Sequence, residues 1–285
     1  MIELTQDDYQ VLIDLSLKED LQDLGDTTTL ATVPEKLEAK AILLAKTNLI
    51  CAGLPVAEAV FKEVDPSLRF KALVKDGQQC QKGSVLAEIY GSAQSLLTAE
   101  RTALNFMQRL AGIATLTGEY VKACGDSKTQ ILDTRKTTPG YRILEKYAVA
   151  MGGAQNHRIG LYDRVMIKDN HRELASLTGP GSIIRSVEAC RAKFPKLEVE
   201  VEADTLDEVK EAIKAKVDYI LLDNMSNEMT REAVAMNDGS SLLEISGGVT
   251  LDRIPELAQL GADFISVGAL THSFISADIS LEIKL

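Results

Sequence analysis

Tryptophan is absent from this chain, and cysteine and histidine are scarce, with four and three copies. No C-x-x-C spacing connects the cysteines and no histidine lies near them in sequence, which argues against a zinc site or a disulfide framework. We therefore expect small, buried hydrophobic roles for Cys51, Cys80, Cys124 and Cys190.

Long apolar runs are also missing, since none approaches the roughly 20 residues that cross a bilayer. The N-terminus, MIELTQDDYQ, has neither the basic flank nor the apolar segment of a signal peptide. Positive charge is in deficit as well, with a formal net charge of -11, whereas nucleic acids and anionic membranes attract a positive surface. We expect a cytoplasmic protein that binds neither nucleic acids nor anionic membranes. A local basic pocket is still compatible with this composition.

The first hundred residues and the rest follow different patterns. Residues 7–21 read as an amphipathic helix that ends in turn chemistry, and residues 39–91 alternate short apolar runs with turn signals, as in a small β-rich domain. A helix is expected at 56–63 within it. Residues 94–124 carry an apolar stripe at helical spacing, which predicts one long helix joining the two halves.

From residue 129 onward, strand and helix patterns alternate six times. Such alternation predicts a parallel sheet with helical crossovers, either an open doubly wound sheet or a barrel. The segment is shorter than the roughly 250 residues of a complete eight-stranded barrel, so a shortened barrel or an open sheet is expected. The strand candidates are TQILD, RVMIK, LEVEVE, DYILLD, LLEIS and DFISV.

Charged residues and glycines follow these strands at their carboxyl ends, where parallel α/β folds place their active sites. The set comprises Arg135, Lys136, Lys168, Glu202, Asp223, Ser246, Gly247, Gly248 and Gly268. Ser246 to Gly248 form a small-residue turn before an expected helix, and backbone N–H groups there can face an anion. Tight turns alone would explain each glycine, but their order after the last two strands favours a phosphate site.

The strand-end charges leave alternatives open. Glu202 and Asp223 suit Mg²⁺, which prefers carboxylates together with substrate phosphates, but they would equally accept hydrogen bonds from ribose or remain solvated. Lys168 follows the apolar run VMI and is expected to be partly desolvated, as a Schiff-base nucleophile or as a point charge for an anion.

Residues 134–171 hold seven Lys or Arg against three Asp or Glu, the opposite of the chain average. Arg142 and Lys146 fit the exposed face of a helix, and Arg164 is expected to pair with Asp163 or Glu145. By contrast, His157 and Arg158 lie in the Gly-rich stretch MGGAQNHRIG, where packing gives little reason for them, so they are candidate binding residues.

In this order, the motifs resemble quinolinate phosphoribosyltransferase, also called nicotinate-nucleotide pyrophosphorylase (carboxylating). The resemblance runs from Glu19 to Ser273, and the combination of DTRKT, NHR and IKDNH is its most specific part. The matching stretches are EDLQDLGDTTT, AERTALNFMQRLAGIAT, LDTRKTTPG, GGAQNHRIGLYDRVMIKDNH, EVEVE, LLDN, SGG and DFISVGALTHS. One departure is Ile245, where the family commonly has Ala; it points away from Ser246 by strand alternation, so little effect is expected.

The resemblance implies an N-terminal α/β-sandwich-like domain (1–112) and an incomplete α/β barrel of six or seven strands (113–271). The tail, 272–285, would pack on the first domain. It implies a homodimer or higher oligomer, in which Arg101 reaches the active site of the neighbouring subunit. From the sequence alone, Arg101 and Asn105 would otherwise be an exposed helix face.

The reaction implied by the resemblance joins quinolinate to 5-phosphoribosyl 1-pyrophosphate with Mg²⁺, giving nicotinate mononucleotide, pyrophosphate and CO2 in NAD biosynthesis. Matching family positions place Lys136 and Lys168 at the pyrophosphate and ribose, and Glu202 and Asp223 at Mg²⁺ or ribose hydroxyls. These four would be the catalytic residues. The remaining substrate-binding residues would be Arg101, Thr134, Arg135, His157, Arg158, Ser246, Gly247, Gly248, Val267, Gly268 and Ala269.

Two other functions fit parts of the sequence. A molybdenum-transport-type paralogue would share the scaffold and bind phosphoribosyl pyrophosphate but not quinolinate. A lyase or aldolase would use Lys168 to form a Schiff base. His171 lies within the family motif but has no role that the sequence assigns.

Overall fold

A computed structural model describes residues 2–284 of the chain. It divides into two compact units, of which unit 1 comprises residues 2–118, 137–154 and 270–284, and unit 2 comprises 119–136 and 155–269. This division does not follow a single break after residue 112, because the segment 137–154 groups with unit 1. None of the helices within residues 2–284 is long and apolar enough to span a membrane.

Unit 1 combines helices with a four-stranded antiparallel sheet of order β12-β1-β5-β3 and a two-stranded β2-β4 pair. Its helices are η1 (Gln6–Asp8), α1 (Gln10–Leu21), α2 (Thr27–Thr32), α3 (Leu54–Val64), α4 (Ala93–Ala123), which continues into unit 2, and α5 (Arg142–Met151). Its strands are β1 (Glu38–Ala45), β2 (Leu49–Ile50), β3 (Arg69–Ala72), β4 (Gln79–Cys80), β5 (Val85–Ser92) and β12 (Ile279–Lys284).

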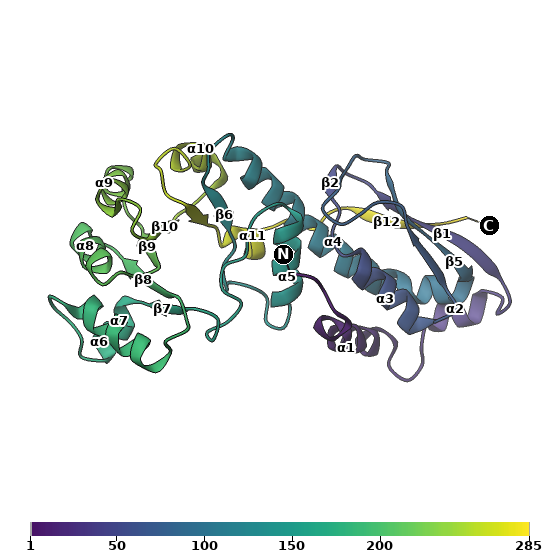
Figure 1. Cartoon of the computed structure of the whole chain (residues 1–285). Coiled ribbons are helices and arrows are strands. Elements are labelled where there is room, and N and C mark those ends of the chain that lie inside the picture. The colour runs from purple at the N-terminus through teal and green to yellow at the C-terminus, as the bar shows by residue number, and fades with distance from the viewer. Residues whose placement is uncertain (1, 285) are drawn as a thin grey trace. The chain divides into compact units, whose positions relative to one another are not determined.

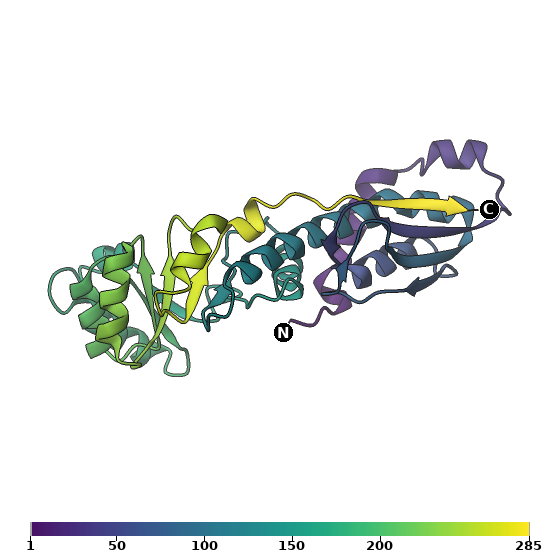
Figure 2. The same ribbon diagram turned by 90° about the horizontal axis from the view of Figure 1, so that it is seen from above.

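The C-terminal strand β12 pairs with β1 along its whole length, with Leu43 opposite Leu281, as Figure 2 shows by the yellow arrow beside β1. The helices predicted at 7–21, 56–63 and 94–124 correspond to α1, α3 and α4. The apolar stripe of α4 is buried, including Leu104 and Met107, because helical spacing brings these side chains to one face. Arg101 and Asn105 are exposed, as predicted.

Unit 2 is an α/β layer structure with one six-stranded parallel sheet. Its strands are β6 (Gln130–Leu132), β7 (Val165–Ile167), β8 (Val199–Ala203), β9 (Tyr219–Asp223), β10 (Leu242–Ser246) and β11 (Phe264–Ser266). Its helices are α6 (Asp169–Leu174), α7 (Ser182–Lys193), α8 (Leu206–Lys214), α9 (Asn227–Asn237), η2 (Leu251–Arg253) and α10 (Ile254–Leu257), and α11 (Ala269–His272) begins at its end.

The strand order β6-β11-β10-β9-β8-β7 is that of a barrel with one opening. Each strand pairs in parallel with the next, but β6 and β7 share no paired residues in the described chain. Helices α7, α8 and α9 lie along the outer side of the strands in Figure 1. The predicted six-stranded incomplete barrel is therefore confirmed.

A single bridge partly fills the opening of the sheet. Gln155 pairs in parallel with Leu132 on the free edge of β6. Its N–H donates to the carbonyl of Ile131 at 2.9 Å, and its own carbonyl accepts from the N–H of Asp133 at 3.2 Å. The segment that follows Gln155 is thus fixed at the open side of the barrel.

Candidate active site

A cavity of about 590 Å³ lies at the carboxyl ends of the unit 2 strands. Most of the residues predicted from strand ends contribute to it, although they come from six different strands and loops. The lining comprises Thr134, Arg135, Lys136, His157, Arg158, Met166, Lys168, Glu202, Leu221, Asp223, Asn224, Glu244, Ser246, Gly247, Gly248 and Ser266. The structure thus brings four Lys or Arg side chains together with three carboxylates.

Strand alternation arranges this lining in two levels. The deeper level, which we call the floor, contains Met166, Leu221, Glu244 and Ser266; the level two residues further along each strand, the rim, contains Lys168, Glu202, Asp223 and Ser246. Glu244 on the floor is fully buried, whereas the rim residue Asp223 is only partly buried. The rim is therefore the level nearer to solvent.

Lys168 and Glu202 form an ion pair on the rim. The side chain of Lys168 is 42% exposed, so it is partly desolvated, as the apolar run before it predicted. The ring Nδ1 of His171 accepts the backbone N–H of Lys168 at 2.9 Å, which caps helix α6 and fixes the turn on which Lys168 stands. His171, a motif residue without a predicted role, thus supports the turn that carries Lys168.

His157 and Arg158 lie on the segment that fills the barrel opening, and both are buried, at 6% and 7% exposure. Asp133, fully buried after β6, accepts the N–H of His157 at 2.7 Å and the side-chain amide of Asn156 at 2.8 Å. This carboxylate clamp explains how a glycine-rich loop holds two polar residues in fixed positions.

The guanidinium of Arg158 donates to the carbonyl of Arg164 at 3.0 Å and contacts Met166 Sδ at 3.5 Å. Burial first, and the positive charge of Arg135 second, lower the pKa of Arg158. Arg135 and Arg158 both line the cavity, so this part of it suits an anionic ligand.

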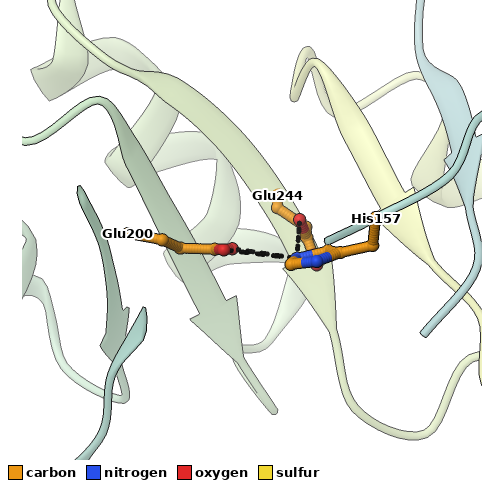
Figure 3. A group of neighbouring side chains, drawn as sticks. All are labelled: His157, Glu200 and Glu244. Atoms are coloured by element: carbon orange, nitrogen blue, oxygen red, sulfur yellow. Dashed lines mark hydrogen bonds and ion pairs between the residues drawn. The ribbon is translucent and has the colours of Figure 1, made fainter. Parts of the chain in front are cut away.

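His157 also joins a buried cluster beneath the cavity, drawn in Figure 3. Its Nε2 lies 3.2 Å from Glu200 Oε2 on β8 and 3.3 Å from Glu244 Oε2 on β10. Burial acts to lower the pKa of His157, but the contacts with the two glutamates outweigh it and raise the pKa to about 9. The three side chains lie near enough to one another to hold a metal ion, but Nδ1 of His157 accepts the N–H of Arg158 at 2.7 Å, so Nε2 carries the ring proton and faces the glutamates as a hydrogen-bond donor rather than as a metal ligand.

The two glutamates of this cluster differ in their surroundings. Burial acts to raise the pKa of Glu200, but contacts with His157 and Arg164 outweigh it, and the pKa is lowered. Burial first, and the charge of Glu200 second, raise the pKa of Glu244. Although Glu244 lies near His157, neither of its oxygens has a hydrogen bond of good geometry within residues 2–284.

The Ser246 to Gly248 turn borders the cavity beside Asn224, whose N–H donates to the carbonyl of Ser246 at 3.0 Å. Gly247 has a φ of +89°, and a Cβ there would lie 2.1 Å from Asn224 Oδ1, so only glycine fits. The helix expected after this turn consists of η2 and the four-residue α10. A helix dipole therefore adds little, and any anion binding rests on the local N–H groups.

Four predicted site residues are absent from the cavity lining. Val267 is buried, and its N–H donates to the carbonyl of Leu132 at 2.9 Å, while Gly268 and Ala269 are partly buried next to it. Arg101 lies on the exposed face of α4 in unit 1.

Two predictions about cationic residues were wrong. Lys146 is fully buried rather than on an exposed helix face, because α5 is enclosed over most of its length. Arg164 forms ion pairs with Glu198 and Glu200, each at 3.5 Å, instead of the predicted pair with Asp163 or Glu145. Glu145 pairs with Arg109 at 2.5 Å.

Comparisons with known families agree with the motifs. The family model "Quinolinate phosphoribosyl transferase, C-terminal domain" matches residues 113–282, and the model of the N-terminal domain matches residues 26–111. The chain belongs to the quinolinate phosphoribosyltransferase family. The cavity in unit 2 therefore lies within the segment that matches the family's C-terminal domain.

Individual relatives of the quinolinate phosphoribosyltransferase family match over nearly the whole chain. A mitochondrial quinolinate phosphoribosyltransferase (decarboxylating) 2 of Nicotiana glauca is 43% identical, covering 97% of this chain and 82% of the relative. A probable nicotinate-nucleotide pyrophosphorylase (carboxylating) of Synechocystis is 45% identical over 84% of this chain and 81% of its own. The crystal structure of NadC from Streptococcus pyogenes superposes with a TM-score of 0.94 at 40% identity, covering 100% and 99% of the two chains.

Several residues of the site were not found from the sequence. Asn224, Met166, Leu221, Ser266 and Glu244 line the cavity, and Glu200 lies beneath it. A signal was present for the glutamates, because Glu200 and Glu244 stand two residues before Glu202 and Ser246 and hence on the same face of their strands.

Proposed function

We propose that this chain transfers the phosphoribosyl group of 5-phosphoribosyl 1-pyrophosphate to quinolinate and removes one carboxylate, which yields nicotinate mononucleotide, pyrophosphate and CO2. The observation that carries the proposal is the cavity in which Arg135, Lys136, Arg158 and Lys168 surround the strand ends of an otherwise acidic chain. Family membership narrows the anionic substrates to this pair.

Quinolinate, the dicarboxylate of the proposed reaction, fits the part of the cavity that Arg135 and Arg158 line. Arg158 is fixed by the carbonyl of Arg164, so its remaining N–H groups are held in one orientation. A guanidinium matches a planar carboxylate with two parallel hydrogen bonds. Arg135 lies near enough to act on the same ligand, since its charge lowers the pKa of Arg158. Neutralisation by the substrate would relieve this repulsion.

The phosphoribosyl donor fits the rim. In this proposal the Ser246–Gly248 turn holds the 5-phosphate, and Lys136 and Lys168 stabilise the negative charge that develops on the departing pyrophosphate. Catalysis would rest on positioning and electrostatics, because the ribose passes through an oxocarbenium-like state that needs no covalent intermediate.

Glu202 and Asp223 would hold Mg²⁺ at the rim. Two carboxylates beside a phosphate site are a suitable donor set, and both residues line the cavity. When bound, Mg²⁺ would supply positive charge to the pyrophosphate oxygens. In this structure, the Glu202 carboxylate forms an ion pair with Lys168. Binding of Mg²⁺ to Glu202 would therefore free Lys168 to turn toward the substrate.

Arg101 enters the proposal through a second subunit. It is exposed on α4, and in a homodimer or higher oligomer it would complete the quinolinate site of the neighbouring chain. A cytoplasmic location is part of the same proposal.

The test is turnover by the purified protein. With quinolinate, phosphoribosyl pyrophosphate and Mg²⁺, we expect stoichiometric CO2, pyrophosphate and nicotinate mononucleotide, and we expect the activity to vanish with a chelator and return with added Mg²⁺. Binding of phosphoribosyl pyrophosphate without binding of quinolinate would instead indicate the molybdenum-transport-type paralogue. No activity in an assay in which a known family member is active would reject the proposal.

The Schiff-base alternative is disfavoured by the ion pair between Lys168 and Glu202. A Schiff-base lysine must present its nitrogen to a substrate carbonyl, whereas Nζ of Lys168 is held by the carboxylate of Glu202. We expect no adduct on Lys168 when borohydride is added together with a carbonyl substrate, as measured by peptide mass.

A further inference from the structure

The buried pair formed by His157 and Glu244 stands apart from the other ionisable groups of the cavity. Both residues line the cavity, yet they are 6% and 0% exposed. The Nε2 of His157 lies 3.3 Å from Glu244 Oε2. In Figure 3 the imidazole reaches across to both glutamates from the loop that fills the barrel opening.

A proton must be shared within this pair at neutral pH. Two buried carboxylates in contact with one imidazole do not both remain ionised without compensation, and Glu200 already has Arg164 at 3.5 Å. The extra proton lies either on His157, as imidazolium, or on Glu244, as a carboxylic acid. Both forms hold the same number of protons, so the pair titrates as one unit.

One contact favours the carboxylic acid form. The backbone N–H of Arg158 donates to His157 Nδ1 at 2.7 Å. That nitrogen must then carry a lone pair, whereas an imidazolium would direct two hydrogens at each other. His157 is then neutral with its proton on Nε2, and Glu244 is a neutral acid without a hydrogen bond of good geometry within the described residues.

We propose that the His157–Glu244 pair supplies the proton that replaces the lost carboxylate on the pyridine ring. This inference rests on the proposed function, and it adds a source for an atom that the reaction requires. An acid at the cavity floor, without a settled hydrogen-bond acceptor, is placed to protonate a carbanion.

After phosphoribosyl transfer, the ring nitrogen is cationic. The bond from ring carbon 2 to its carboxylate then breaks, the electron pair stays on carbon 2 beside the positive nitrogen, and CO2 adds back unless carbon 2 is protonated, after which CO2 leaves. Carbon 2 takes the proton of the pair, a new C–H bond forms, and Glu244 is left as a carboxylate next to neutral His157. Solvent restores the proton after the product leaves.

Other groups near Glu244 are less suited to this task. The guanidinium of Arg158 is engaged with the carbonyl of Arg164, and that of Arg164 with Glu198 and Glu200. Glu200, on β8, contacts His157 and Arg164, which lower its pKa. Ser266, on β11, has a hydroxyl group, which is a weak acid. Lys168 is paired with Glu202 on the rim.

The experiment is a single turnover of Glu244→Gln, quenched in acid, with separate measurement of pyrophosphate, CO2 and mononucleotides. Glutamine has the shape of a neutral acid but no acidic proton, so the variant is expected to fold. Pyrophosphate release should keep its rate, while nicotinate mononucleotide forms about 10²- to 10⁴-fold more slowly, the usual range for a lost general acid. The dicarboxylated mononucleotide should accumulate.

Glu198→Gln is the matched control, because Glu198 is 57% exposed and also contacts Arg164 but lies outside the cavity lining. It should show the wild-type time courses. Glu244→Asp should regain part of the lost rate, since it restores an acid at a shorter reach.

Three results are decisive. Equal slowing of pyrophosphate and CO2 release in Glu244→Gln, or no slowing of either, would overturn the inference. If the wild-type protein itself shows no turnover, that result rejects the proposed function, on which this inference rests. Should Glu244→Gln not fold, the wild-type protein decides: its decarboxylation step must fall as pH rises through about 9 while pyrophosphate release does not, and parallel pH profiles contradict the pair as proton source.

Discussion

The backbone N–H of His157 donates to Asp133 Oδ1 over 2.7 Å. This bond ties His157, which contacts Glu200 and Glu244, to the end of strand β6 at the opening of the barrel. A buried carboxylate thus sets the position of the loop that carries His157 and Arg158.

Replacing Asp133 by alanine removes this clamp. The N–H of His157 and the amide of Asn156 lose their acceptor in a buried site, which costs about 1–3 kcal/mol for each unsatisfied group. We expect a lower free energy of unfolding in urea and a higher KM for quinolinate. Asp126→Ala, at an exposed position, should change neither quantity, and an unchanged KM in Asp133→Ala would contradict the positioning role.

Gly247→Ala should weaken binding of the phosphoribosyl donor. A Cβ at Gly247 would collide with Asn224, whereas at Gly239, which has a similar positive φ of +73°, it would meet nothing within 4 Å. Both substitutions carry the same backbone cost, so their difference reports the collision. We expect the KM for phosphoribosyl pyrophosphate to rise about a hundredfold for Gly247→Ala alone, since small misplacements are costly in rate and binding.

Lys168→Gln should lower kcat/KM for phosphoribosyl pyrophosphate by about 10²- to 10³-fold, because a positive charge facing the departing pyrophosphate is lost. The control is Lys210→Gln, which removes an exposed ion pair with Asp207 and is expected to leave the kinetics unchanged. Equal effects of the two substitutions would mean that only the overall charge matters.

Stability should decline in alkaline solution because of the buried pair of His157 and Glu244. The folded-state pKa of about 9 at His157 lies above the usual 6.5, so the pair keeps, on one member or the other, a proton that the unfolded chain has lost between these values. The contribution is complete below about pH 6.5 and is lost as pH rises through about 9. We expect urea midpoints to fall between pH 7 and pH 9.5, and His157→Gln to flatten this slope. An identical slope in the variant would assign the decline to other groups.

Mixing two inactive variants tests the shared site. Arg101→Ala and Arg135→Ala subunits, refolded together, should regain about a quarter of the wild-type activity, because half of the dimers carry one intact site of two. Mixtures of Lys136→Ala with Arg135→Ala should regain none, as both residues line the same cavity. Verified heterodimers without activity would exclude a contribution of Arg101 across the interface.

Periodicity predicted the fold well, since the six strand patterns from residue 129 correspond to β6 through β11. Strand ends also located the cavity, because parallel strands bring their carboxyl ends to one edge. The partners of Arg164 and the burial of Lys146 were missed, since they depend on contacts between segments distant in sequence. Glu200 and Glu244 were overlooked because polar residues inside a barrel lie in short apolar-looking strands, although alternation placed them on the cavity face.

The bridge between Gln155 and Leu132 is the only pairing that the described structure shows at the open side of the barrel. Backbone pairing of the loop with His157 and Arg158 thus consists of two hydrogen bonds of Gln155, besides those that the Asp133 side chain accepts, while the neighbouring strands are held by full ladders. Local opening should begin at this point. Hydrogen exchange of the amides of residues 155–158 would then be faster than that of β8 to β10, and a bound dicarboxylate would slow it, so that substrate binding would be seen as local protection of the loop.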